Sequence, residues 1–221
     1  HIPGTFDTIE TFGLMWQGWV FKYAFLNHLD VANYHFVSYP FGLPETRAVI
    51  FPVGMFIIKW LSILTNEVFM YNSQILSGFV LSGVFAFLLV HFITKNTYAA
   101  IFSGIIYTFC PYHFARAWQH LGLAQIQWLP LYLFALFKLR EERTIANSIF
   151  VALSFFLFSE NYIYSYFMVI TTIVFLLFLL LWKQEENKLA FVKLLAWSVF
   201  FIFLLTLPAA FIVYKNYFFV S

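Results

Sequence analysis

The chain has 221 residues, of which 62% are hydrophobic, 24% aromatic and only 10% charged. Soluble domains carry about 25% charged residues, so this chain cannot cover the surface of a water-soluble fold. Its net charge of +2, with no basic tract, gives no reason to expect a nucleic-acid partner. Segments such as 174–182 are continuously apolar rather than alternating, which favours helices over a β-barrel. We therefore predict an all-α, polytopic transmembrane helix bundle.

Residues 1–71 differ from the rest of the chain because they hold four prolines and scattered charges. Met15–His28 is rich in Trp and Tyr, which concentrate at membrane interfaces, and predicts a helix too short and too polar to span. The Pro and Gly content of 39–44 predicts a turn. Ala48–Leu64 is apolar but short and carries Lys59. We expect it to be partly embedded or buried against other helices, with a tilted span as the alternative.

Six apolar segments follow, and we predict that they are membrane spans of one domain, residues 72–221. They are 72–94, 97–112, 121–138, 144–159, 161–182 and 190–214. Several are shorter than the roughly 20 residues that a perpendicular span needs, and short spans can tuck against neighbours. The chain begins at His1 without a visible signal peptide and stops at Ser221 after an apolar stretch. We therefore expect a fragment of a longer protein.

Lysine and arginine in short loops predict orientation, because they favour the cytoplasmic side of a membrane. If the six segments simply alternate, one side receives seven basic residues: Lys95, Lys138, Arg140, Arg143, Lys183, Lys188 and Lys193. We predict that this side is cytoplasmic and that the protein is an integral membrane protein. The non-cytoplasmic side then receives the loop 1–71, the 113–120 connection and the turn at 159–162. An error of one span would undo this grouping.

Asp7 and Glu10 form an acidic pair near the start of the chain. A spacing of three places both carboxylates on one face if the segment is helical. In a shielded cavity, a carboxylate can act as a general base or as a metal ligand. The alternative is a helix cap in a solvated loop.

His113, Arg116 and His120 follow Pro111, a residue that suits the first turn of a helix. Offsets of three and seven predict that the three side chains share one helical face. A cationic, donor-rich face at the membrane boundary suits a phosphate or pyrophosphate. The alternative is an interfacial helix whose Arg and His side chains meet lipid headgroups.

Two further charged residues stand at the ends of apolar segments. Glu160 lies between two of them, and an acid at membrane depth is by default a candidate functional residue. If a tight turn joins two spans there, Glu160 instead sits at the interface at little cost. Lys215 is either a substrate contact or an interfacial lysine that snorkels to water. The lone Cys110 excludes an internal disulfide.

The order of features along residues 4–140 is also informative. The features are, in order, Asp7, a Trp-rich helix at 16–19, an aromatic-Pro-x-Gly turn at 39–42, Phe-Cys-Pro-Tyr-His-Phe-Ala-Arg at 109–116, His-Leu at 120–121 and Gln-Trp-Leu-Pro-Leu at 127–131. This order resembles the multi-spanning GT-C superfamily of glycosyltransferases, in particular the bacterial and archaeal members related to protein mannosyltransferases and lipid A aminoarabinose transferases.

The resemblance implies an enzyme that transfers a sugar from a polyprenyl-phosphate-linked donor to a glycan, lipid or protein acceptor. The catalytic Asp of that superfamily lies in the first non-cytoplasmic loop, just after the first span. Asp7 occupies the matching place, and the first span would precede His1. The superfamily's paired acids are here the looser pair of Asp7 and Glu10, which leaves the role of Glu10 open.

The resemblance also implies roles for the other candidates. Asp7 would accept the proton of the acceptor hydroxyl, and Arg116, with His120 or Lys215, would stabilise the leaving lipid phosphate. Some members of the superfamily bind a divalent metal and others do not. Asp7 and Glu160 are the candidate ligands if one binds here, and no other cofactor is implied.

Two other functions remain as alternatives. A transporter or flippase of a lipid-linked or amphiphilic solute would need polar residues lining a cavity at mid-bilayer and often shows inverted repeats. Neither is clear in this sequence. A non-catalytic membrane assembly protein would use the polar face as a surface for partner proteins.

Overall fold

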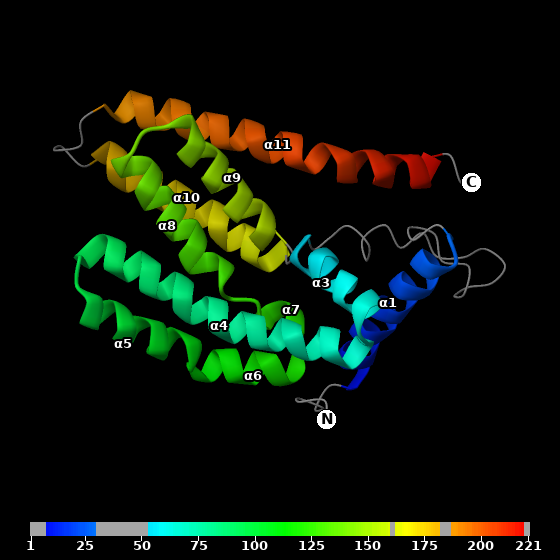
Figure 1. Ribbon diagram of the computed structural model, residues 1–221. Coiled ribbons are helices and arrows are strands. Elements are labelled where there is room, and N and C mark those ends of the chain that lie inside the picture. The colour runs from blue at the N-terminus through cyan, green and yellow to red at the C-terminus, as the bar shows by residue number, and fades with distance from the viewer. Residues whose placement is uncertain (1–7, 30–52, 160–161, 182–186, 219–221) are drawn as a thin grey trace. The chain divides into compact units, whose positions relative to one another are not determined.

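Every regular element in the described part of the chain is an α-helix, as the computed structural model shows (Figure 1). The structure describes residues 8–29, 53–159, 162–181 and 187–218. The predicted all-α class is confirmed over these ranges.

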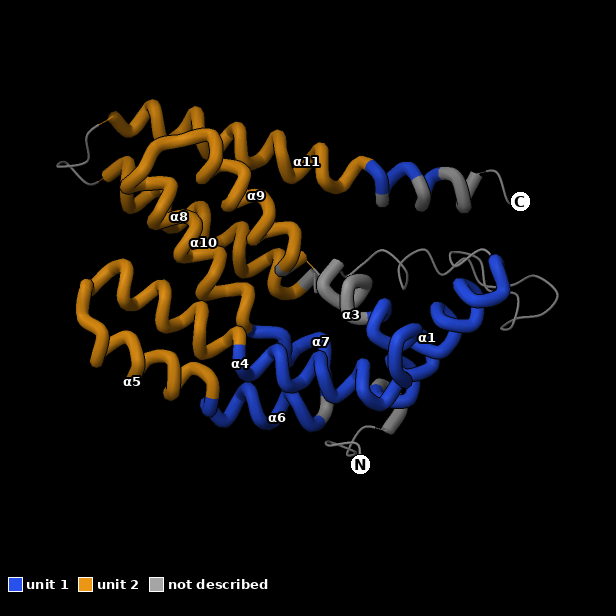
Figure 2. Tube along the Cα trace, viewed as in Figure 1, with its two compact units in different colours: residues 1–80, 109–126, 208–221 blue, residues 81–108, 127–207 orange. Residues whose placement is uncertain are grey.

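The chain divides into two compact units (Figure 2). The first comprises residues 1–80, 109–126 and 208–221, and the second comprises 81–108 and 127–207. The first unit thus includes three segments from the predicted membrane domain, residues 72–80, 109–126 and 208–221. The assignment of residues 1–71 to a non-cytoplasmic loop stays a prediction.

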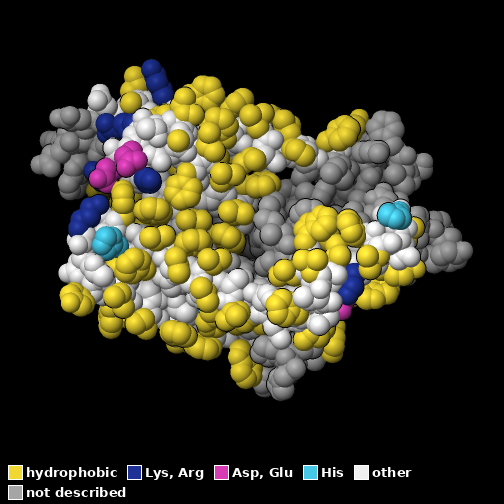
Figure 3. All heavy atoms as spheres, in the orientation of Figure 1, with side chains coloured by type: hydrophobic (Ala, Val, Ile, Leu, Met, Phe, Trp, Pro, Cys, Tyr) yellow, Lys and Arg dark blue, Asp and Glu magenta, His cyan; other side chains and the backbone are white. Residues whose placement is uncertain are grey.

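Three helices are long and apolar enough to cross a membrane. They are α4 (Glu67–Thr94), α10 (Tyr162–Leu181) and α11 (Lys188–Phe218). Only 17%, 17% and 11% of the residues in their most apolar stretches are buried within the protein. Hydrophobic side chains are accordingly spread widely over the described part of the face in Figure 3. Such a surface is stable only against lipid or other apolar partners, so these three helices have the length and the surface that a membrane-crossing helix needs.

The other three predicted spans are shorter or broken. The segment 97–112 contains α5 (Thr97–Thr108) and the start of α6 (Pro111–Gln119), while 121–138 contains α7 (Leu121–Ala124) and most of α8 (Trp128–Glu141). The segment 144–159 is α9 (Ile145–Phe158). Helices α5, α8 and α9 have 12, 14 and 14 residues, fewer than the roughly 20 of a perpendicular span. The predicted sidedness, which needs six alternating spans, therefore stays a prediction.

In the first unit, α1 (Thr8–Leu26) packs against α3 (Val53–Leu64). The predicted helix is thus present, but it begins seven residues earlier than expected, at Thr8 rather than Met15, and has 19 residues. Its interfacial location stays a prediction. Helix α3 has 12 residues and holds Lys59 at only 4% exposure. This agrees with the expectation that the segment is buried against other helices.

The second unit has its core between α8, α9, α10 and α11. Buried side chains from all four helices meet there: Tyr132, Ala135, Leu136, Leu139, Val151, Met168, Leu179 and Phe191. Thr144 caps α9 by accepting a hydrogen bond from the Asn147 backbone N–H at 3.2 Å. Ser148 Oγ donates across to the Leu194 carbonyl of α11 at 2.9 Å. Polar side chains therefore satisfy backbone groups while apolar ones fill the interior.

Helices α4 and α5 approach closely at two glycines. A Cβ added to Gly104 would lie 2.9 Å from the Gly83 carbonyl oxygen, and one added to Gly83 would lie 2.7 Å from Thr108 Oγ1. Small residues let helix backbones come this close in a membrane, where van der Waals packing drives helix association.

We expect Gly104→Ala to destabilise the protein by about 1–3 kcal/mol, because the added methyl group meets backbone that cannot rotate away. Gly13→Ala is the control, since nothing lies within 4 Å of its Cβ position in the middle of α1. That change should be neutral or stabilising by up to about 1 kcal/mol. Unfolding free energies in detergent mixtures test both, and equal effects would refute the close approach of α4 and α5.

Candidate functional site

Tyr71 of α4 links the first turn of α1 to helices α6 and α7 within the first unit. Its hydroxyl lies 3.2 Å from Thr11 Oγ1, and the two residues are 2% and 4% exposed. Its ring packs in a hydrophobic cluster with Ala117 of α6 and Leu121 and Ala124 of α7. Leu14 and Met15 of α1 and Ile75 and Phe79 of α4 pack against the same cluster. The start of α1 and the α6–α7 segment therefore share one core.

The acidic pair flanks the beginning of α1. Asp7 lies outside the described residues and directly precedes the first helical residue, Thr8. Glu10 belongs to the first turn of α1, whose backbone the structure describes without the Glu10 side chain. The next residue, Thr11, is the one that contacts Tyr71. Both interpretations of the pair, a helix cap and a catalytic pair, stay open.

Two more predicted residues cannot be located in the site. Glu160 lies outside the described residues, between α9 and α10. Lys215 belongs to the last turns of α11, where the structure describes the helix without that side chain. Their assignment to substrate or metal stays a prediction.

His113 faces the protein interior. It is fully buried, and its ring stacks on Phe79 of α4 with centroids 3.9 Å apart and planes 12° apart. Arg116, one turn later, is half-buried, with its guanidinium carbon 5.3 Å from the ring centroid of Tyr112. A guanidinium at this distance from an aromatic face is stabilised electrostatically. Of the two, Arg116 is the one placed to meet an anion at the surface, whereas His113 packs in the core.

His120 lies beyond the end of α6. Its φ of −140° and ψ of 87° are not helical, and its backbone N–H donates to the Arg116 carbonyl at 2.8 Å. Its own carbonyl accepts from the backbone of Leu123 and Ala124 at the start of α7. The predicted common helical face is therefore wrong for His120, because the helix ends at Gln119. The predicted helix start at Pro111 is confirmed, since Pro111 occupies the first turn of α6.

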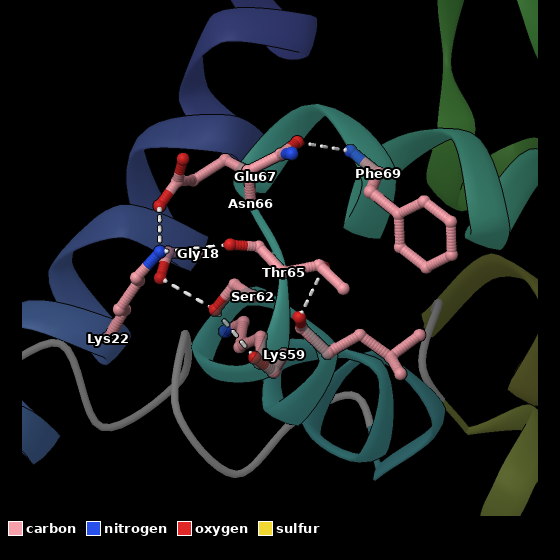
Figure 4. Close-up of polar contacts among 9 residues, drawn as sticks. Gly18, Lys22, Lys59, Ser62, Thr65, Asn66, Glu67 and Phe69 are labelled. Atoms are coloured by element: carbon pink, nitrogen blue, oxygen red, sulfur yellow. Dashed lines mark hydrogen bonds and ion pairs between the residues drawn. The ribbon is translucent and has the colours of Figure 1, made fainter.

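A polar junction between α1, α3 and α4, which is not among the predicted sites, forms around Lys22 (Figure 4). Lys22 Nζ lies 3.7 Å from Glu67 Oε1 and donates to the Thr65 carbonyl at 3.2 Å. Asn66 Oδ1 accepts from the Phe69 backbone N–H at 2.9 Å, which caps the start of α4. The ion pair therefore ties α1 to the first turn of α4.

Ser62 of α3 adds a second link at this junction. Its hydroxyl lies 3.1 Å from the Gly18 carbonyl of α1 and 2.6 Å from the Lys59 carbonyl of its own helix (Figure 4). Ser62 is fully buried, and Lys59 is nearly so. The available sequence signal was a lysine inside an otherwise apolar segment, which predicts burial with polar neighbours.

Among the described residues, no group of three or more His, Cys, Asp and Glu side chains could hold a metal ion. The predicted metal candidates, Asp7 and Glu160, lie outside that part of the chain. No protein-family model, curated protein or solved structure matches this chain.

The Thr11–Tyr71 hydrogen bond can be measured by a double-mutant cycle with Thr11→Val and Tyr71→Phe. We expect a coupling energy of about 1 kcal/mol, because both hydroxyls are buried and a typical net hydrogen bond contributes that much. Unfolding free energies of the wild type, both single variants and the double variant supply the value. Strictly additive effects would show that the two hydroxyls do not interact.

Proposed function

We propose that the protein is a GT-C type membrane glycosyltransferase that moves a sugar from a polyprenyl-phosphate-linked donor to an acceptor on the non-cytoplasmic face. The first support is the order of sequence features along residues 4–140. The second is the set of apolar helices, since an apolar carrier is best handled by a protein that is itself in the bilayer.

The observation that carries the proposal is the core around Tyr71. It joins the first turn of α1, which contains Glu10 and directly follows Asp7 in the sequence, to the α6–α7 segment, where the cationic residues lie. A base and an anion-stabilising group must approach one reacting centre within hydrogen-bond reach. Sharing a core favours that proximity, because it fixes the two segments within one unit.

In the proposed reaction, an acceptor hydroxyl oxygen attacks the anomeric carbon of the donor sugar. The bond between that carbon and the phosphate oxygen breaks, and Asp7 takes the hydroxyl proton. The polyprenyl phosphate leaves with the bonding electrons. Its charge is stabilised by Arg116, with His120 or Lys215 as the second partner.

The burial of His113 and the partial exposure of Arg116 bear on which of the two residues would bind the phosphate. His113 is removed from direct contact with the phosphate, because it is fully buried against Phe79. Arg116 is the better candidate for binding the phosphate, because it is half-exposed beside Tyr112. We propose that His113 positions α6 against α4 and that Arg116 binds the phosphate.

The decisive variant is Asp7→Asn, which keeps the size of the side chain and removes its basicity. We expect sugar transfer to fall by roughly 10²–10⁴-fold, the contribution typical of a general base. The assay follows radiolabel from polyprenyl-phosphate-linked hexoses, pentoses and amino sugars into membrane acceptors. Released polyprenyl phosphate is quantified in parallel.

Asp30→Asn is the matched control, because Asp30 is the only other aspartate in the chain and lies in the same predicted loop. It should leave transfer within about twofold of the wild type, because the proposed reaction gives Asp30 no role. Unchanged transfer in the Asp7→Asn variant would refute the assignment of the base. Movement of the lipid-linked donor across vesicles without any transfer would establish the flippase alternative instead.

A further inference from the structure

A cavity of about 390 Å³ opens in the second unit where α4 and α8 end. It is lined by Phe92, Ile93, Lys95, Phe137, Arg140 and Glu141. Its size falls within the range of about 300–1,000 Å³ that small-molecule sites occupy. Figure 3 shows basic and acidic side chains gathered at one end of this unit, with many hydrophobic side chains beside them.

The lining combines two cations with an apolar wall. Lys95 and Arg140 contribute two positive charges and Glu141 one negative charge, so the cavity carries a net positive charge. The neighbouring Lys138 and Glu142 lie 4.0 Å apart and balance each other. Phe92 and Phe137 form the apolar part, together with Ile93, which is 50% exposed. An amphiphilic anion matches both halves of this lining.

Lys95 is held in an unusual backbone conformation at this cavity. It directly follows the last residue of α4, with a φ of 55°, in the left-handed region where glycine is favoured. Its Nζ lies 4.5 Å from the centroid of the Phe92 ring. Basic residues at helix C-termini also interact favourably with the helix dipole. The helix dipole can explain a lysine at the end of α4, but it does not explain why apolar side chains line the cavity beside that lysine.

We propose that this cavity binds an anionic glycerophospholipid. Lys95 and Arg140 would bind the phosphate, and an acyl chain would lie along Phe92, Ile93 and Phe137. Helix α4 is a membrane-crossing helix by length and composition, so its end belongs at the level of the lipid headgroups. Basic pockets between helices at that level are suited to anionic headgroups. A lipid fits better than a free phosphate, because a free phosphate leaves the apolar half unused.

The test uses the full chain in detergent, with dioctanoyl phosphatidylglycerol as the anionic probe and dioctanoyl phosphatidylcholine as the zwitterionic one. Native mass spectrometry or a thermal shift titration gives both affinities. We expect the wild type to prefer the anionic lipid. Lys95→Gln should reduce that preference roughly fivefold and the Lys95→Gln, Arg140→Gln double variant roughly 30-fold, from the contribution of each basic residue.

Lys193→Gln is the matched control, since Lys193 is an exposed lysine of the same unit on α11. It should keep the preference for the anionic lipid, and so should Lys95→Arg, which retains the charge. Circular dichroism identifies any variant that fails to fold. If the double variant fails, the lipid preference of Lys95→Gln is compared with that of the control instead. The proposal is overturned if Lys193→Gln lowers the preference as much as Lys95→Gln. It is equally overturned if glycerol 3-phosphate competes at the same concentration as the lipid.

Discussion

A helix surrounded by lipid has to satisfy every backbone polar group within itself, because no water is present to do so. The same lack of water applies to hydroxyl side chains on the long apolar helices, which donate to backbone carbonyls of their own helix. Thr172 donates to the Met168 carbonyl in α10, and Thr206 donates to the Phe203 carbonyl in α11. The same helices bury few of their apolar residues inside the protein. Because lipid can cover the apolar surface of such helices, the protein needs only a small buried core.

Sequence analysis predicted an element correctly where a single local property, such as hydrophobicity or a proline, determines that element. Hydrophobicity placed the three long apolar helices among the six predicted spans, and Pro111 marked the start of α6. Apolar character did not reveal that 97–112 is interrupted, because the break depends on backbone geometry at Cys110 and Pro111 rather than on hydrophobicity. The shared face of His113 and His120 failed for a related reason. Helical periodicity holds only while the helix continues, and α6 ends at Gln119.

The polar contacts of the first unit could not be predicted, because they join residues far apart in the chain. Lys22 and Glu67 are separated by 45 positions, and Thr11 and Tyr71 by 60. The burial of His113 likewise depends on Phe79, which a single helix pattern cannot indicate. The candidate site thus divides into two kinds of residue. Asp7 and Arg116 are candidates because of their side-chain chemistry, which the sequence shows directly. Whether neighbouring residues such as His113 are exposed depends on tertiary packing, which the sequence does not show.

The lengths of the crossing helices differ, and this difference has a mechanical consequence. At about 1.5 Å per residue, the 28 residues of α4 extend about 42 Å and the 20 residues of α10 about 30 Å. A hydrocarbon core is about 30 Å thick, so α10 matches it while α4 has to tilt or project by about two turns. Glu67, at the start of α4, is paired with Lys22 and retains partial exposure. If α4 crosses the membrane, a thicker bilayer would bring this ion pair closer to the hydrocarbon, and the stability of the protein would then depend on the acyl-chain length of its host membrane.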